Sequence, residues 1–182
     1  MRKTIIVSVA TGLIGLGVLA APMAAYADGP PPGGTTATFD LNAGSLSISV
    51  PSGATLEAAT VGASSVSGQL GDVSVTDYRG DMSDTWTATV TTTDFTGGTN
   101  DVTVGASGVS YNPGAALTGS GTFGAAATEG TAGPIGDALV AYSQNGAQGS
   151  NGVSWDPTIT ISLPAGGQVA DTYSGTITQS VA

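Results

Sequence analysis

The sequence contains no cysteine and no histidine, and its three basic residues are Arg2, Lys3 and Arg79. Histidine and cysteine carry most acid–base and nucleophilic chemistry near neutral pH. Their absence excludes a Ser-His-Asp triad and disulfide cross-links. Beyond residue 27 one cation stands against 13 carboxylates, so a nucleic-acid partner, whose counterions basic side chains would displace, is not expected. We predict a protein that is not an enzyme and needs no cofactor.

Carboxylates are the remaining reactive groups. The aspartates at positions 72, 77, 81 and 84 are near one another in the sequence, and carboxylate oxygens are calcium ligands. Their spacing matches no EF-hand loop, which needs a central Gly and a terminal Glu. The two glutamates, Glu57 and Glu129, form no paired-carboxylate motif of the kind that hydrolyses glycosides. We therefore predict no metal site and no catalytic residue.

The first 27 residues have the pattern of a signal peptide. Arg2 and Lys3 precede an apolar run that ends before Pro22, and Ala25-Tyr26-Ala27 is a small-x-small cleavage site. We expect cleavage between Ala27 and Asp28, which gives an extracellular protein with no stable membrane span. The alternative is a membrane anchor, for which about 20 apolar residues suffice. Residues 28–35, rich in Pro and Gly, are expected to form an extended leader.

Residues 36–182 are expected to form one all-β domain. Apolar residues alternate with Thr or Ser over 36–50, 84–95 and 159–163, which is the period of a strand with one buried face. About eight to ten short strands separated by Gly and Pro turns predict an antiparallel, immunoglobulin-like sandwich, with a closed barrel as the alternative. The Gly- and Ala-rich region 112–152 is expected to be mainly loop, with a strand near 139–142 and a weaker candidate at 117–123.

Two segments resemble a known family. Residues 75–90 read VTDYRGDMSDTWTATV, and the chain ends with TISLPAG and then DTYSGTITQSVA. Together they resemble the WxL domain of Gram-positive surface proteins, whose members have a D-x-R-G element before a first W-x-L and end with Y-x-x-T-L-T-W-x-L. Asp77, Arg79, Gly80 and Trp86 match the first motif, whereas Ala88 stands in place of its Leu.

The final strand matches this pattern in part. Tyr173, Thr176, Ile177 and Thr178 follow it, while Gln179 and Val181 replace its Trp and Leu. The resemblance covers roughly residues 39–181. It implies an immunoglobulin-like sandwich at the cell surface, attached non-covalently to peptidoglycan.

The candidate ligand-binding residues are Asp77, Arg79, Trp86 and Trp155. Arg79 lies among aspartates, so we expect an ion pair that fixes a strand-to-loop corner; alternatively, its guanidinium binds a carboxylate of a wall peptide. Trp86 alternates with apolar residues and is expected in the core, with an exposed sugar platform as the alternative. Trp155 precedes Asp156-Pro157, and we expect it to be partly exposed, where it would stack on a sugar or close the end of the sandwich.

These observations predict a secreted protein that associates with the Gram-positive cell wall. The expected partner is peptidoglycan or another wall polymer, with other surface proteins as further candidates. Two alternatives remain open. One is a structural or adhesive subunit that self-associates through a sheet edge, for which the nearly uncharged C-terminal strand is a candidate. The other is a carbohydrate-binding module.

Overall fold

The computed structural model describes residues 34–123 and 126–182. The chain divides into two compact units, residues 1–40 and 41–182. The described part of the first unit, residues 34–40, contains no helix or strand. The predicted signal peptide, its cleavage site at Ala27 and Asp28, and most of the predicted leader lie outside the described residues.

The second unit is built from strands. The described residues form fourteen strands and one turn of 3-10 helix, η1 (Ala106–Gly108). The strands are β1 (Leu46–Ser49), β2 (Ser65–Gln69), β3 (Val73–Asp77), β4 (Asp84–Thr92), β5 (Phe95–Gly97), β6 (Thr103–Val104), β7 (Val109–Asn112), β8 (Ala116–Phe123), β9 (Thr128–Glu129), β10 (Gly133–Pro134), β11 (Leu139–Trp155), β12 (Thr158–Ser162), β13 (Tyr173–Ser174) and β14 (Ile177–Val181).

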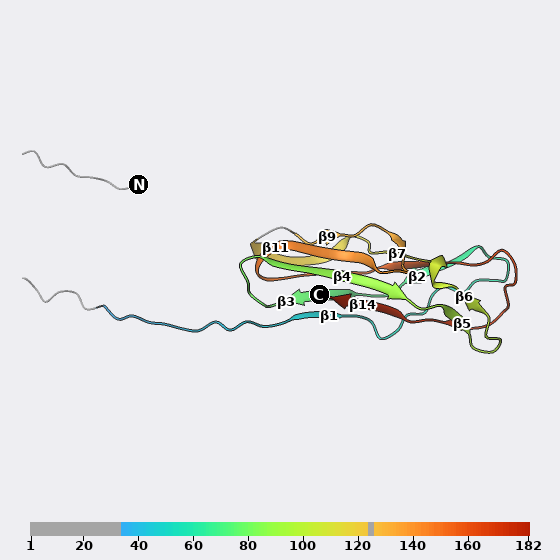
Figure 1. The fold of residues 1–182 in the computed structure, drawn as a ribbon, viewed down its shortest axis with the longest axis horizontal. Coiled ribbons are helices and arrows are strands. Elements are labelled where there is room, and N and C mark those ends of the chain that lie inside the picture. The colour runs from blue at the N-terminus through green and yellow to red at the C-terminus, as the bar shows by residue number, and fades with distance from the viewer. Residues whose placement is uncertain (1–33, 124–125) are drawn as a thin grey trace, which may run out of the picture. The chain divides into compact units, whose positions relative to one another are not determined.

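Every strand pairing is antiparallel. The largest sheet, part of which is labelled in Figure 1, has the order β1-β3-β11-β4-β14. Strands β8 and β9 also pair with β11. Two smaller sheets have the orders β10-β7-β12-β2 and β13-β5-β6. The two end strands of the largest sheet, β1 and β14, lie close to each other without pairing, so this sheet is nearly closed. The predicted all-β antiparallel class is confirmed.

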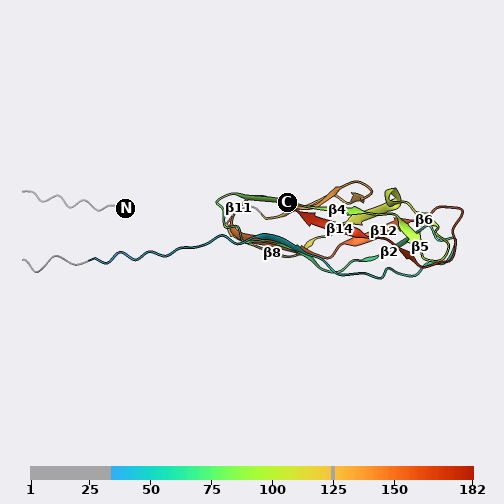
Figure 2. The same cartoon turned by 60° about the horizontal axis from the view of Figure 1, so that its bottom comes forward.

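Strand β11 connects the two layers. Its first half pairs with β4 and β9, and its second half pairs with β3 and β8. Between the halves the register shifts at Asn145/Ala147 and again at Gln148/Asn151, and Gly146 and Gly149 have positive φ. Such bulges bend a strand, and glycine adopts positive φ without strain. Figure 2 shows the resulting layers, with β4 on one side and β8 on the other.

The core follows the predicted two-residue period. In β3 the buried residues alternate from Val73 through Val75 to Asp77, and in β4 they alternate from Asp84 through Trp86 and Ala88 to Val90. The largest fully enclosed side chains are Trp86, Trp155, Tyr111 and Tyr142. One apolar cluster includes residues of all three sheets, which holds the layers together.

Two local predictions are wrong. No strand forms over residues 36–41, where Phe39 and Leu41 are 88% and 91% exposed; the first strand begins at Leu46. Region 112–152 is not mainly loop, because β8, β9, β10 and most of β11 lie in it. Sheet hydrogen bonds join main-chain groups, and small residues can therefore form strands with no apolar alternation. The strand at 139–142 and the weaker one at 117–123 do exist, as parts of β11 and β8.

Candidate functional site

Arg79 lies in the loop between β3 and β4 and joins their ends. Its Nε donates to Asp77 Oδ1 at 2.9 Å, and one terminal nitrogen donates to Asp77 Oδ2 at 2.7 Å. The same nitrogen donates to the carbonyl of Thr85 at 2.8 Å, and the Arg79 backbone N–H donates to Asp77 Oδ1 at 3.0 Å. This two-point contact is the strong geometry of an arginine–carboxylate pair. Arg79 therefore fixes the last residue of β3 against the start of β4.

The contact continues into the core through β11. Asn151 donates from Nδ2 to Asp77 Oδ2 at 3.4 Å and to the carbonyl of Gly149 at 3.3 Å. Its Oδ1 accepts a 2.8 Å hydrogen bond from Trp86 Nε1. We call Asp77, Arg79, Asp84, Trp86 and Asn151 the Arg79 corner. It joins the ends of β3 and β4 to the bend of β11, so its polar groups hold the place where the two layers meet.

The two carboxylates of the corner differ in their partners. The Arg79 guanidinium lowers the pKa of Asp77. The Asp77 side chain is fully buried, and burial acts in the opposite direction on this pKa. Asp84 is 2% exposed, and its Oδ1 lies 3.8 Å from Arg79 Nε. Within the described residues, neither Asp84 oxygen has a hydrogen-bond partner. Burial, and then repulsion from Asp77, raises the pKa of Asp84. In the Arg79 corner, the charge of Asp77 is therefore well paired, whereas the charge of Asp84 is poorly compensated for its burial.

Trp155 belongs to a second buried cluster. Its Nε1 donates to Tyr111 Oη at 2.8 Å, and that hydroxyl donates to Gln179 Oε1 at 3.0 Å. The ring centroids of Trp155 and Tyr142 are 4.7 Å apart, and Tyr142 Oη donates to the carbonyl of Gly114 at 2.6 Å. The expectation that Trp155 is partly exposed is wrong: it is 0% exposed. It shares an inner face with Val153 and Asn151, because these positions alternate along β11.

The four predicted ligand-binding residues therefore lie in two places. Asp77, Arg79 and Trp86 meet at the Arg79 corner, and Trp155 lies in the other cluster. Trp86 is in the core, as expected, at 2% exposure. Neither indole ring is open to stacking on a sugar. Asn151 was not among the predicted site residues. The two-residue period through 151, 153 and 155 could have identified it, because this period places Asn151 on the same buried face of β11 as Val153 and Trp155.

The outward faces carry hydroxyl groups instead. On β4 and β14, Thr91 lies opposite Thr178, and Thr89 lies opposite Ser180 with their hydroxyl oxygens 3.0 Å apart. Thr87 continues the row on β4. The residues of this surface, which we call the threonine track, are Thr87, Thr89, Thr91, Thr178 and Ser180. The other layer has a similar face, where Ser47 lies 2.8 Å from Thr76 and Thr118 contacts Ser154.

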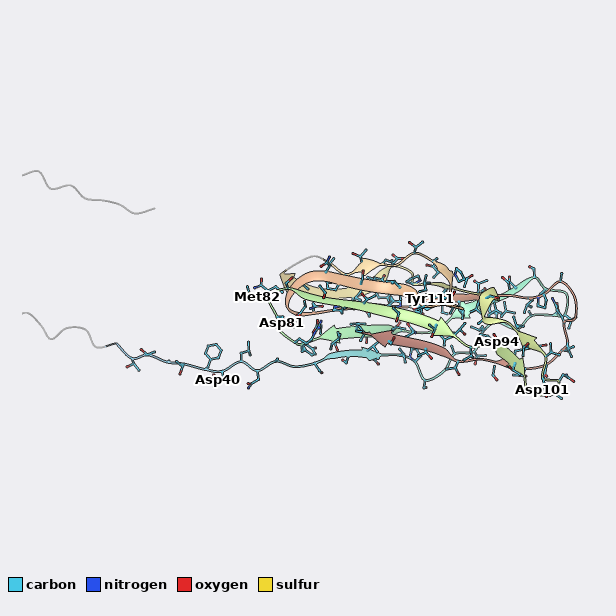
Figure 3. The ribbon with its side chains drawn as sticks, viewed as in Figure 1. Asp40, Asp81, Met82, Asp94, Asp101 and Tyr111 are labelled. Carbon is cyan, nitrogen blue, oxygen red and sulfur yellow. The ribbon has the colours of Figure 1, made fainter. Side chains whose placement is uncertain are left out.

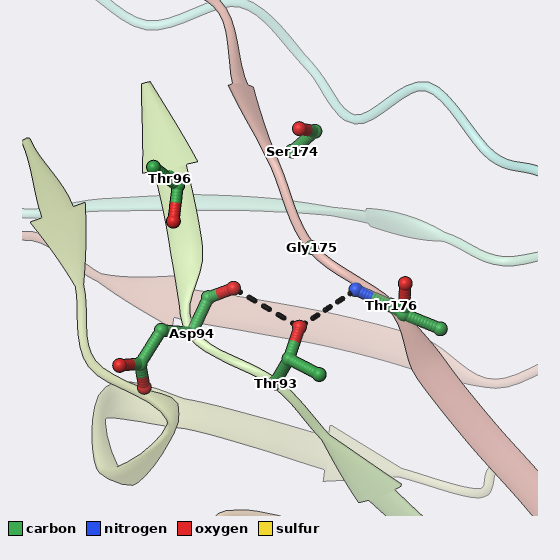
Figure 4. Close-up of a pocket in the computed structure, with 6 residues that line it drawn as sticks. All are labelled: Thr93, Asp94, Thr96, Ser174, Gly175 and Thr176. Atoms are coloured by element: carbon green, nitrogen blue, oxygen red, sulfur yellow. Dashed lines mark hydrogen bonds between the residues drawn. The ribbon is translucent and has the colours of Figure 1, made fainter. Parts of the chain in front are cut away.

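The threonine track ends at a polar hollow of about 490 Å³, lined by Thr93, Asp94, Thr96, Ser174, Gly175 and Thr176 (Figure 4). Thr93 Oγ1 accepts a 3.0 Å hydrogen bond from the backbone N–H of Thr176 and donates to the carbonyl of Asp94. The hollow thus lies where the segment after β4 is hydrogen-bonded to the segment before β14. Its volume is in the range of small-ligand sites, but its lining is polar and contains no aromatic ring.

The outward faces of β4, β11 and β14 carry no charged side chain. Strands β4, β11 and β14 contain one charged residue, Asp84, and it is buried. Exposed carboxylates lie mainly in loops: Figure 3 places Asp81 at one end of the sandwich and Asp94 and Asp101 toward the other. Among the residues described, no three His, Cys, Asp or Glu side chains are grouped to hold a metal ion. That part of the chain also contains no helix of the length and hydropathy needed to cross a membrane.

Comparisons with known proteins return no relative. A scan against protein-family models, a search of curated proteins and a search of solved structures each find no match.

Proposed function

We propose that this chain is a secreted, non-catalytic protein that binds a polymer of the Gram-positive cell wall, with peptidoglycan as the expected ligand. The observation that carries the proposal is the threonine track, which leads along two paired strands into the polar hollow. Each hydroxyl offers one donor and two acceptor positions. A row of them suits a linear polymer rich in hydroxyl and amide groups. The resemblance of the D-x-R-G and Trp86 segment to the WxL domain supports the same ligand class.

The charge distribution is compatible with an anionic wall. The excess of carboxylates would repel such a polymer, but the track itself carries none. At physiological ionic strength, charges are screened over about 8 Å. A polymer lying along β4 and β14 would therefore meet neutral groups first. The Arg79 corner has a structural role in this proposal, because its guanidinium is already bound by Asp77 and the Thr85 carbonyl.

The test is sedimentation of the protein with purified peptidoglycan. The variant Thr89→Val/Thr178→Val removes two hydroxyls from the track and keeps residues that favour strands. Each lost hydrogen bond is worth about 0.5–1.5 kcal/mol, so we expect binding to weaken roughly tenfold. The matched control, Thr76→Val/Thr118→Val, removes two hydroxyls from the opposite layer, where each also contacts a serine. The control should bind as the parent does.

Two results would reject the proposal. Equal recovery of the parent protein with and without wall material would show that it does not bind. Equal losses in both double variants would show that the threonine track is not the binding surface.

A further inference from the structure

Two asparagines in the bend of β11 are each followed by glycine. The chain has five asparagines, and the pairs Asn145-Gly146 and Asn151-Gly152 are the two in which glycine comes next. Asparagine is a chemically labile residue, because the main-chain nitrogen of the next residue can attack its side-chain amide carbon. A Cβ on that next residue hinders the attack, and glycine has none. The bend therefore contains two sites with the same favourable local sequence.

The fold protects Asn151. This residue is 3% exposed, and its Oδ1 accepts a hydrogen bond from Trp86 Nε1 at 2.8 Å. Its Nδ2 donates to two further oxygens, one of them a main-chain carbonyl. Gly152 is paired on both sides, with β3 and with β8. The side chain of Asn151 and the main chain that would attack it are thus both held in place.

The fold leaves Asn145 open. Its side chain is exposed, and within the part of the chain that the structure describes no hydrogen bond holds its side-chain amide. Gly146 is the extra residue of a bulge, because Asn145 and Ala147 lie opposite consecutive residues of β4. The φ of Gly146 is 76°, which is outside the extended range of a strand. The main chain therefore departs from strand geometry directly after an unrestrained asparagine side chain.

We propose that Asn145 is a site of spontaneous deamidation in the folded protein and that Asn151 is not. The nitrogen of Gly146 attacks Cγ of Asn145, the Cγ–Nδ2 bond breaks, and ammonia leaves with the proton of the attacking N–H. Water then opens the five-membered imide ring at either carbonyl, which gives an aspartyl or an isoaspartyl residue at position 145. The reaction consumes water alone, and it neither oxidises nor reduces the chain.

The modification adds a carboxylate to a face that has none. Asn145 lies opposite Thr85, which is exposed, and the next pair on this face is Ser143 and Thr87. Thr87 is the first residue of the threonine track. Each event adds one negative charge to a chain whose net charge is already −10 at pH 7. This consequence follows from the register of β11 and β4, and it holds whether or not the track binds a wall polymer.

The test compares the two asparagines within one fragment. Chymotrypsin cuts after aromatic residues, and cleavage after Tyr142 and Trp155 releases residues 143–155 with both Asn-Gly pairs. The chain that starts at Asp28 is incubated in the folded state at mildly alkaline pH, and fragment mass spectra taken over time locate each conversion of an amide to a carboxylate. Because its hydrogen bonds raise the barrier for Asn151, we expect Asn145 to convert roughly tenfold faster or more.

The same chain in concentrated guanidinium chloride is the matched control. Unfolding exposes both pairs equally, so there the two asparagines should convert at similar rates. Asn145→Gln keeps an amide but requires a larger ring, and it should abolish the acidic species that ion-exchange chromatography separates from the aged parent. Asn100→Gln replaces an exposed asparagine that precedes Asp101, and it should leave that species unchanged. A folded chain in which Asn145 stays intact, or converts no faster than Asn151, overturns the inference.

Discussion

Replacing Arg79 tests whether the corner is held by one guanidinium. Arg79→Met keeps most of the apolar stem and removes the charge. Asp77, which is fully buried, would lose two side-chain hydrogen bonds, and Asp84 would lose its nearest cation. No other Lys or Arg lies beyond residue 3. Two buried carboxylates would therefore remain without a compensating charge.

The expected loss of stability can be set from the burial of the partners. Removing one partner of a buried pair costs about 3–5 kcal/mol. The Arg79 side chain is 33% exposed, so water already weakens the pair and the lower end applies. Asp77 also keeps the Arg79 backbone N–H and Asn151 as donors. We expect a loss of about 3 kcal/mol, which corresponds to a fall of roughly 10 °C in melting temperature for a domain of this size.

The pH dependence gives the sharper result. The pKa of Asp77 is lowered in the folded protein, so its contribution to stability is present above the unfolded value of 3.8 and is lost as the pH falls. Without Arg79 this contribution disappears, and both carboxylates favour their neutral forms in the fold. The deficit of the variant should therefore be largest at pH 7 and shrink toward pH 3.

Urea unfolding followed by tryptophan fluorescence at pH 7 and pH 3 measures both quantities, because Trp86 and Trp155 are buried. Asp81→Asn is the control. It removes a charge from the same loop at an exposed position and should change stability by less than about 0.5 kcal/mol. A loss below about 1 kcal/mol at pH 7, or a deficit that is the same at both pH values, would refute this account of the corner.

Two further substitutions test the buried polar groups. Asp84→Asn should stabilise the protein by about 1 kcal/mol at pH 7, because a buried carboxylate without hydrogen-bond partners is costly even beside Arg79. Since the folded pKa of Asp84 is raised, this gain in stability should vanish below the unfolded pKa, and a net loss in urea unfolding at pH 7 would contradict it. Tyr111→Phe leaves Trp155 Nε1 without its acceptor and should cost about 1–3 kcal/mol, which calorimetry would measure; an unchanged melting temperature would show that another group or water replaces the hydroxyl.

Large apolar side chains in alternation predicted several strands correctly, but the same pattern at Phe39 and Leu41 forms no strand. The alternation through Trp86, Ala88 and Val90 indicated β4, and its burial is as expected. The same reasoning failed for β11, because its bend contains Asn145 to Gly152 and offers no apolar period. At Gly152, an added Cβ would collide with the Val75 carbonyl. Here glycine allows close strand packing, so a residue usually taken as a turn signal marks the centre of a sheet.

The candidate site was predicted only in part, for a related reason. Arg79 and Asp77 were recognisable because a lone cation beside carboxylates must find a partner. The threonine track depends on the pairing of β4 with β14, which brings Thr91 and Thr178 together although 86 residues separate them in the sequence. Alternation shows which side of a strand is polar, but it does not show which strands are neighbours.

The two end strands of the largest sheet carry no charged residue, although the edge strands of a sheet commonly carry charge as protection against pairing with another chain. Here β1 and β14 lie close to each other, so each strand shields the outer side of the other. Charge on these two strands is therefore not needed to prevent association. The carboxylates lie mainly in the loops instead, where they oppose non-specific association through net charge.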